Sequence, residues 1–317
     1  MRTVKISACQ FPIARGGFDE FRARIEAALA EVPRDSDYVL FPELFTVGLV
    51  TVYPDASSVA DLIRIVEFTA RYRELFHQVA TSRKQFVLAG SHLEKQGDLY
   101  FNVAHLFTPE GRELTHKKTH IFPAESQWQT TEGNTLEVWD IGPAKVGVAI
   151  CYEAEIPEVC RILAYNGAEV ILCPSFTFSE AGFWRVRHCA QARCIENQIY
   201  FVHCCTIGNA GAPLPPGYGR SSILSPCDQP WNPNGIVAEA TTNKQMVVTA
   251  SVDIDPLYEN RKTGAATTFR DRIRRAPMYN QYSPYRPGAG ENILTGERVE
   301  ASDTQAEQSR VAKTWSE

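Results

Sequence analysis

Short apolar runs rich in β-branched residues recur through most of the chain, and amphipathic stretches with helical periodicity lie between several of them. Runs such as VKISACQF, LYFNVAHLF, KVGVAIC and MVVTASVDI are typical of buried strands. In the first amphipathic stretch an apolar stripe is formed by Phe18, Phe21, Ile25, Ala28 and Leu29. The alternation predicts an α/β domain, and a 44% hydrophobic composition over 317 residues is ample for its core.

Apolar stripes, and residues that favour the start or end of a helix, predict several helices along the chain. An apolar stripe from Val59 to Val79 predicts one long helical stretch. A helix with Pro157 in its first turn is expected to bury Val159, Ile162 and Leu163 and to stop near Gly167, and another is expected over 180–197.

Composition changes only once, near residue 276. Residues 276–317 are rich in Pro, Gly and polar residues and contain few large apolar ones. Such a segment buries too little apolar surface to fold by itself. We therefore expect one domain over residues 1–275 and a polar tail over 276–317 that is extended or partly disordered.

Charge and targeting features narrow the range of partners. A net charge of -5 gives no basic surface that would favour nucleic acid or an anionic membrane. The N-terminus is too polar for a signal peptide, and no apolar run approaches the roughly 18 residues of a membrane span. We expect a cytoplasmic protein whose partner is a small molecule.

The cysteines and histidines do not predict a metal site. Nine cysteines, an odd number, lie mostly in apolar segments, as reduced buried thiols do, and none forms a C-x-x-C pair. His116 and His120 have i, i+4 spacing, but the Lys-Lys-Thr between them offers no carboxylate and two repelling cations. No metal or other cofactor is expected.

Three polar residues stand at the ends of otherwise apolar runs: Glu43 in VLFPELF, Lys118 in THKKTHIFPAE and Cys151 in KVGVAICYEAEIPE. Catalytic groups often gather at strand ends in α/β proteins, because the sheet holds the backbone rigid while the side chains enter a crevice. In isolation each residue also has a structural interpretation, as a turn cap, a solvated lysine and a small core thiol respectively. Position alone leaves both interpretations open.

Together the three residue types could perform nucleophilic catalysis on an acyl carbon. Lys118 and a helix beginning near Ile156 would lower the pKa of the Cys151 thiol. Glu43 could accept the thiol proton and return it to the departing amine. Lys118 and the backbone N–H of Tyr152 could stabilise the oxyanion of the tetrahedral intermediate.

The segments around these residues resemble, in the same order, the Glu, Lys and Cys motifs of the nitrilase (carbon-nitrogen hydrolase) superfamily. The matching blocks are FPE at 41–43, KTHI at 118–121, ICYEAEIPEVCR at 150–161, GAEVILCPS at 167–175 and ARCIENQ at 192–198. The resemblance covers roughly residues 3–270. It implies that Glu43 is the general base, that Lys118 stabilises the intermediate and that Cys151 is the nucleophile.

The resemblance also implies further pocket residues. A second glutamate is expected after the lysine, and Glu125 is preferred to Glu132 for this position. Arg193, Glu196 and Asn197 are expected in a buried polar network away from the reacting atoms. Beside the nucleophile, the residues expected to bind the substrate or its oxyanion are Tyr152, Glu153, Ser175 and Phe176.

The fold implied by the resemblance is a four-layer α-β-β-α sandwich whose subunits pair through helical faces into an eight-layer homodimer. The helix that carries Val159 and Ile162 is the expected interface.

The residues after the nucleophile favour one branch of the superfamily. Cys151-Tyr152-Glu153 is closer to the C-Y-D pattern of amidase-like members than to the C-W-E or C-G-E of nitrilases, although Glu replaces Asp. The expected reaction is hydrolysis of a small amide, with a nitrile or an N-carbamoyl amine as the alternative substrate. A non-catalytic interaction module and a redox protein using Cys204 and Cys205 are the rival hypotheses.

Overall fold

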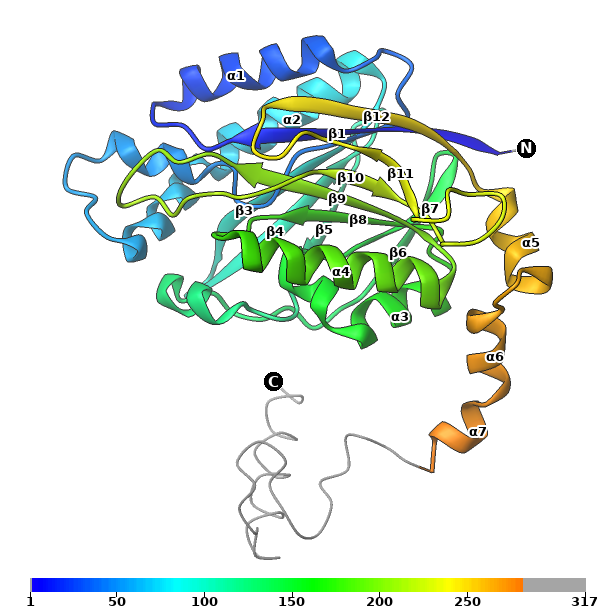
Figure 1. Ribbon diagram of the computed structural model, residues 1–317. Coiled ribbons are helices and arrows are strands. Elements are labelled where there is room, and N and C mark those ends of the chain that lie inside the picture. Colours follow the sequence, from blue (N-terminus) through cyan, green and yellow to red (C-terminus); the bar gives the residue numbers. More distant parts are fainter. Residues whose placement is uncertain (1, 282–317) are drawn as a thin grey trace, which may run out of the picture. The chain divides into compact units, whose positions relative to one another are not determined.

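The computed structural model describes residues 2–281, and the fold over these residues is mixed α/β (Figure 1). Its strands are β1 (Thr3–Pro12), β2 (Tyr38–Leu40), β3 (Phe86–Gln96), β4 (Leu99–Phe107), β5 (Glu113–Lys117), β6 (Val138–Ile141), β7 (Ala144–Val148), β8 (Val170–Ser175), β9 (Tyr200–Ile207), β10 (Ser222–Leu224), β11 (Ile236–Glu239) and β12 (Met246–Asp253). Its α-helices are α1 (Phe18–Glu31), α2 (Thr69–Arg83), α3 (Pro157–Tyr165), α4 (Glu180–Asn197), α5 (Asp255–Thr263), α6 (Thr268–Arg274) and α7 (Ala276–Tyr279). The 3₁₀ helices are η1 (Val47–Val52), η2 (Val59–Phe68), η3 (Pro123–Trp128) and η4 (Cys151–Glu155).

The strands form two groups that are joined at one point. In the first group the strands pair in the order β5-β4-β3-β2-β1-β12, and in the second in the order β6-β7-β8-β9-β10-β11. The ends of β1 and β9 connect the groups through the pairs Phe11–Thr206 and Pro12–Ile207. Parallel pairs such as β7–β8 and β8–β9 need crossover helices, which α3 and α4 supply.

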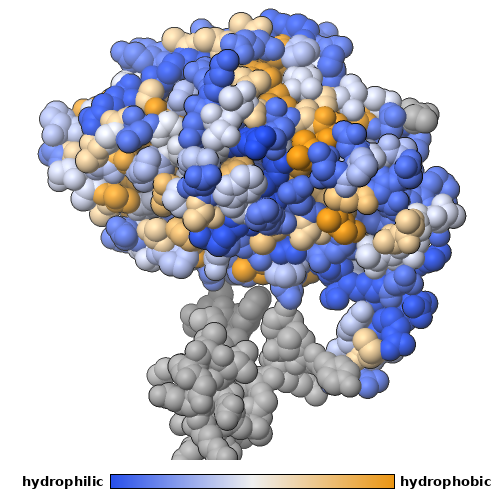
Figure 2. Space-filling model, viewed as in Figure 1, coloured by the Kyte–Doolittle hydropathy of each residue, from blue (hydrophilic) through white to orange (hydrophobic). Residues whose placement is uncertain are grey.

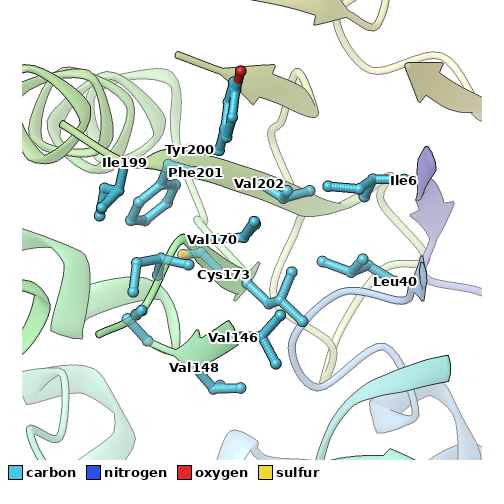
Figure 3. Packing of buried hydrophobic residues seen from close by; sticks show 14 of the residues in the cluster. Ile6, Leu40, Val146, Val148, Val170, Cys173, Ile199, Tyr200, Phe201 and Val202 are labelled. Atoms are coloured by element: carbon cyan, nitrogen blue, oxygen red, sulfur yellow. The ribbon is translucent and has the colours of Figure 1, made fainter. Parts of the chain in front are cut away.

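Successive residues of one strand pack into different cores, because side chains alternate across a sheet. Ile6 and Leu40 belong to a core that also includes Val146 and Val202 of the second strand group. Figure 3 shows these side chains facing one another between the two groups. A second core takes the opposite face of the first group, where α1 and α2 contribute the residues Phe21, Ile25, Leu75 and Phe76.

The helices mostly begin and end where the sequence predicts, but one helix type and one buried residue were predicted incorrectly. Pro157 occupies the first turn of α3 and α4 spans Glu180–Asn197, as predicted. The stretch expected to be helical over 59–79 is helical throughout, but its first part is the 3₁₀ helix η2 and only the second part, α2, is an α-helix. The burial of Ile162 was also wrong: Val159 and Leu163 are buried, whereas Ile162 is 44% exposed on the outer side of α3.

The C-terminal region contains the second of two units into which the chain divides, the first ending at Phe269 and the second beginning at Arg270. The second unit includes α7, so the first residues of the predicted tail are helical. The remainder of that prediction, residues 282–317, lies outside the described residues. The boundary expected after residue 275 stays a prediction.

The face of the molecule seen in Figure 2 is mostly hydrophilic, with hydrophobic residues in small patches. Within residues 2–281, every helix is too short or too polar to cross a membrane.

Candidate active site

Lys118 lies one residue beyond β5, and its side chain is buried between two carboxylates. Its Nζ donates to Glu43 Oε1 at 2.7 Å and also contacts Glu125 Oε1. Burial opposes the ammonium charge, but Glu125 and Glu43 hold the pKa of Lys118 above its usual range. The structure therefore brings three of the predicted site residues together, with the two carboxylates on either side of the lysine ammonium. Glu132, the alternative to Glu125, is exposed and accepts from the backbone N–H of Ile121.

Glu43 follows β2 and is 2% exposed. Its Oε1 accepts from Lys118, and its Oε2 accepts from the backbone N–H of Phe176 at 2.8 Å. Burial raises the pKa of Glu43, while the charge of Lys118 and hydrogen bonds from Lys118 and Cys151 oppose this increase. A carboxylate whose pKa is moved toward neutrality, and which contacts a thiol, is suited to general-base chemistry.

Cys151 is the first residue of η4, three residues after the end of β7. Its φ of 47° lies in the left-handed region, which is uncommon for a residue with a Cβ and indicates a backbone held by its surroundings. The thiol is 3.8 Å from the carbonyl oxygen of Phe176. The sulfur therefore lies next to the carbonyl of Phe176, and the thiol is hydrogen-bonded to Glu43.

The predicted lowering of the thiol pKa was wrong for the free protein. Burial and the negative charge of Glu43 raise the pKa of Cys151 well above its usual value, and Lys118 opposes them only in part. The expected helix α3 begins six residues later, at Pro157, with η4 in between. Cys151 is accordingly a neutral thiol that needs a base at the moment of attack.

Asn102, which the sequence analysis missed, connects the two carboxylates. This residue of β4 is fully buried, and its Nδ2 donates to Glu43 Oε1 at 3.0 Å and to Glu125 Oε2 at 3.1 Å. Its backbone carbonyl accepts from the N–H of Lys118 at 2.9 Å. A single amide within the apolar run LYFNVAHLF was the available signal, because a buried polar side chain needs partners.

Glu153 was expected to bind substrate, but its carboxylate is occupied by protein donors. It is fully buried and accepts from His116 Nε2 at 2.9 Å, from the backbone N–H of Thr119 at 2.8 Å and from the backbone N–H of Ile150 at 2.6 Å. These bonds connect the turn that bears Cys151 to the segment that bears Lys118. Glu153 therefore fixes the distance between the Cys151 motif and the Lys118 motif.

The other end of η4 is held by α4. Arg193 Nε donates to the carbonyl of Ala154 at 3.1 Å, and its Nη2 donates to the carbonyl of Glu155 at 3.2 Å. Glu196 accepts from Arg193 at 3.0 Å, and Asn197 Nδ2 donates to the carbonyl of Arg193. The predicted polar network therefore exists and anchors the nucleophile turn.

A cavity of about 260 Å³ opens beside Cys151. Of the predicted binding residues, Tyr152 and Phe176 line it, while Ser175, at the end of β8, is 1% exposed and lies outside the lining. Aromatic side chains form part of the wall, with Phe122 packed edge-on against Tyr152 and Phe178 against Phe176. Such a small, mostly apolar cavity is suited to a small organic molecule.

Cys204 and Cys205, the residues of the redox hypothesis, lie outside the cavity lining. Cys204 and Cys205 are both buried, pack into different cores and have pKa values that burial raises. That environment does not favour the redox hypothesis. Among residues 2–281, no three or more His, Cys, Asp and Glu side chains are grouped to hold a metal ion.

Comparisons with known proteins place these observations in a family. The family model described as Carbon-nitrogen hydrolase matches residues 5–262. Probable hydrolase YhcX of Bacillus subtilis (strain 168) is 36% identical over 278 residues, which are 86% of this chain and 54% of that protein. Omega-amidase NIT2-A of Xenopus laevis is 26% identical over 290 residues, which are 88% of this chain and 98% of that protein. The chain thus spans about half the length of the first relative and nearly all of the second.

The fold has counterparts among solved structures. Nit3 of Saccharomyces cerevisiae, a member of branch 10 of the nitrilase superfamily, aligns with a TM-score of 0.67 at 22% identity, covering 82% of this chain and 93% of that chain. At this identity the likeness concerns the fold alone. The family match over most of the chain confirms the resemblance predicted from the five motif blocks. The chain belongs to the carbon-nitrogen hydrolase family.

Proposed function

We propose that this chain hydrolyses a small amide, R-CO-NH2, to the acid and ammonia through a thioester on Cys151. The observation that carries the proposal is the buried cluster in which Lys118 lies between Glu43 and Glu125, next to a thiol that borders a small cavity. Family membership and the omega-amidase named among the relatives support amide chemistry.

The first half of the reaction forms the acyl-enzyme. Cys151 Sγ attacks the carbonyl carbon while Glu43 takes the thiol proton, which the raised pKa of the thiol makes necessary. The ammonium of Lys118 and the backbone N–H of Tyr152 stabilise the oxyanion. The C–N bond breaks as Glu43 returns its proton to the nitrogen, and ammonia leaves.

The second half consumes water. Glu43 takes a proton from a water molecule, whose oxygen attacks the thioester carbon. The C–S bond then breaks, the sulfur recovers the proton from Glu43 and the acid departs. Glu125 holds the charge and direction of Lys118 throughout, so the cation does not move as the carbonyl oxygen becomes negative.

We also propose that the chain folds as a four-layer α-β-β-α sandwich and that two copies form a homodimer. The two strand groups and the shared core between them support the layers, as does the position of α1 and α2 on the side opposite α3 and α4 (Figure 1). The exposed side of α3 and α4 carries large apolar residues, which favours burial against a second copy: Ile162, Tyr165, Trp184 and Ile195. Val159 is buried in the core of its own chain and is excluded from this interface.

The decisive experiment measures ammonia release over aliphatic amides, ω-amides, nitriles and N-carbamoyl amines, with Cys151→Ala as the matched variant. We expect release from amides and its loss in the variant, with a far-UV circular dichroism spectrum like that of the parent. Mass spectrometry of a quenched reaction should find the acyl group on Cys151. Release only from nitriles or N-carbamoyl amines would replace the amide proposal, and release unaffected by Cys151→Ala would contradict the mechanism.

A further inference from the structure

Two side chains of opposite charge line the cavity beside Cys151, and the proposed reaction uses neither. They are Glu155, the last residue of η4, and Arg185 of α4, whose Nε lies 3.4 Å from Glu155 Oε2. The other lining residues are aromatic, small, apolar or hydroxyl-bearing, apart from Cys151 itself: Phe122, Tyr152, Phe176, Thr177, Phe178, Ser179, Gly182 and Val186. The charges on this wall therefore come from one ion pair.

The two partners differ in how firmly they are held. The Glu155 side chain is 17% exposed, and its backbone carbonyl accepts from Arg193. The Arg185 side chain is 53% exposed at the cavity mouth. An ion pair with one such exposed partner is weak, because water competes for the charges. A ligand with complementary charges can therefore replace it.

The pair lies within reach of a molecule whose carbonyl carbon is at Cys151. Glu155 lies four positions after Cys151 in the 3₁₀ helix η4, and at a rise of about 2 Å per residue their Cα atoms are about 8 Å apart along the helix axis. Ser179, the N-cap residue of the 18-residue helix α4, and Gly182 in its first turn also line the cavity. The partial positive charge of that helix end adds to Arg185 in favouring an anion there.

We infer that the far end of the substrate is zwitterionic, with an ammonium bound by Glu155 and an adjacent carboxylate bound by Arg185. The substrate class is an α-amino acid whose side chain ends in a carboxamide. A singly charged head group would separate the pair and satisfy only one of its members. A zwitterion exchanges the single ion pair for two, one with each side chain. This inference rests on the proposed amide hydrolysis.

Four amides that share the butanamide skeleton and differ only in the charged groups on its C4 test the inference by kcat/KM for ammonia release. L-Glutamine carries both charges, 4-aminobutanamide only the ammonium, 4-carbamoylbutanoate only the carboxylate, and butanamide neither. Each charge is expected to raise kcat/KM about 10-fold or more, since charge-assisted hydrogen bonds are the stronger class. Glutamine should therefore exceed butanamide by about 100-fold.

Two variants assign the charges to their partners. In Glu155→Gln the ratio of glutamine to 4-carbamoylbutanoate should fall toward one, because the ammonium loses its acceptor. In Arg185→Gln the ratio of glutamine to 4-aminobutanamide should fall toward one. Glu158→Gln removes the same charge from an exposed position outside the cavity and should change neither ratio. Thermal melting of each variant checks that it is folded.

The outcomes separate this inference from the proposed function. Equal kcat/KM for the four amides, a preference for a singly charged amide, or ratios that neither variant alters would overturn the zwitterion while leaving amide hydrolysis intact. Absence of ammonia from these four and from every other amide would overturn both.

Discussion

Replacing Lys118 by Met tests whether the ammonium holds the buried carboxylates together. The Lys118 side chain is inaccessible to solvent, and its Nζ binds Glu43 and Glu125. Met fills a similar volume but leaves the two acids buried without their cation. Removing one partner from a buried ion pair costs about 3–5 kcal/mol, because the remaining charge stays desolvated. We expect a loss of that size in the free energy of unfolding, together with the loss of hydrolysis.

The loss in the free energy of unfolding of Lys118→Met should increase with pH. Burial already raises the pKa of Glu43, and Lys118 is the charge that opposes it, so the folded-state pKa rises further in the variant. A carboxyl group whose folded pKa lies above its unfolded value stabilises the protein only at low pH, and that stabilisation is lost as the pH rises through the folded pKa. Urea titrations at pH 5 and pH 8 should therefore give the larger difference between variant and parent at pH 8.

The neighbouring lysine provides the control. Lys117 is partly exposed, and its Nζ lies 4.3 Å from the centre of the Phe101 ring. Lys117→Met should cost only about 1 kcal/mol or less, the usual range of such a cation–π contact. Similar losses for the two variants, or a loss in Lys118→Met that is independent of pH, would refute the charge-based account.

Three further substitutions probe buried polar groups, two of them around the site. Asn102→Ala removes the donor shared by two buried carboxylates, so urea unfolding should show a loss of about 1–3 kcal/mol, and an unchanged midpoint would argue against this role. Burial opposes ionisation of Glu153, but its neighbours, chiefly His116, lower its pKa. The stabilisation that this carboxylate contributes is therefore present above the unfolded pKa and lost as the pH falls through the folded pKa. Glu153→Gln should lower Tm more at pH 7 than at pH 3. Despite burial, the pKa of His105 is raised by hydrogen bonds that include one to Glu113, so its stabilisation is complete below the unfolded pKa and lost as the pH rises through the folded value. His105→Gln should therefore lower Tm more at pH 6 than at pH 9, and an equal shift at both would contradict the assignment.

The sequence predicted correctly those strands and helices that are buried on one face or on all sides. The apolar runs of the sequence contain the central strands, and the helix expected over 180–197 became α4 with the predicted bounds. The strands that were missed, β5, β6 and β11, each pair with a single neighbour. An edge strand is only partly buried, so its sequence need not be apolar, and ELTHK in β5 gives little periodic signal.

The sign of the thiol pKa shift could not be obtained from residue types alone. Cys151 has an ammonium and a carboxylate nearby, and the two act in opposite directions. Burial decides the outcome, since removing water penalises the thiolate whatever its neighbours are. Exposure is a property of the packed structure rather than of the segment that contains the cysteine.

The sequence by itself determined the α/β class, the family and the order of the Glu, Lys and Cys motifs, because hydrophobic periodicity and short motifs are local properties of the chain. Only the tertiary structure decided that Asn102 connects Glu43 to Glu125 and that Glu155 meets Arg185 at the cavity. These contacts join residues far apart in the chain, and the pairing of strands and the packing of helices set their distances. A polar side chain finds its partners only once those elements have packed, and the chemistry of the site depends on the partners it finds.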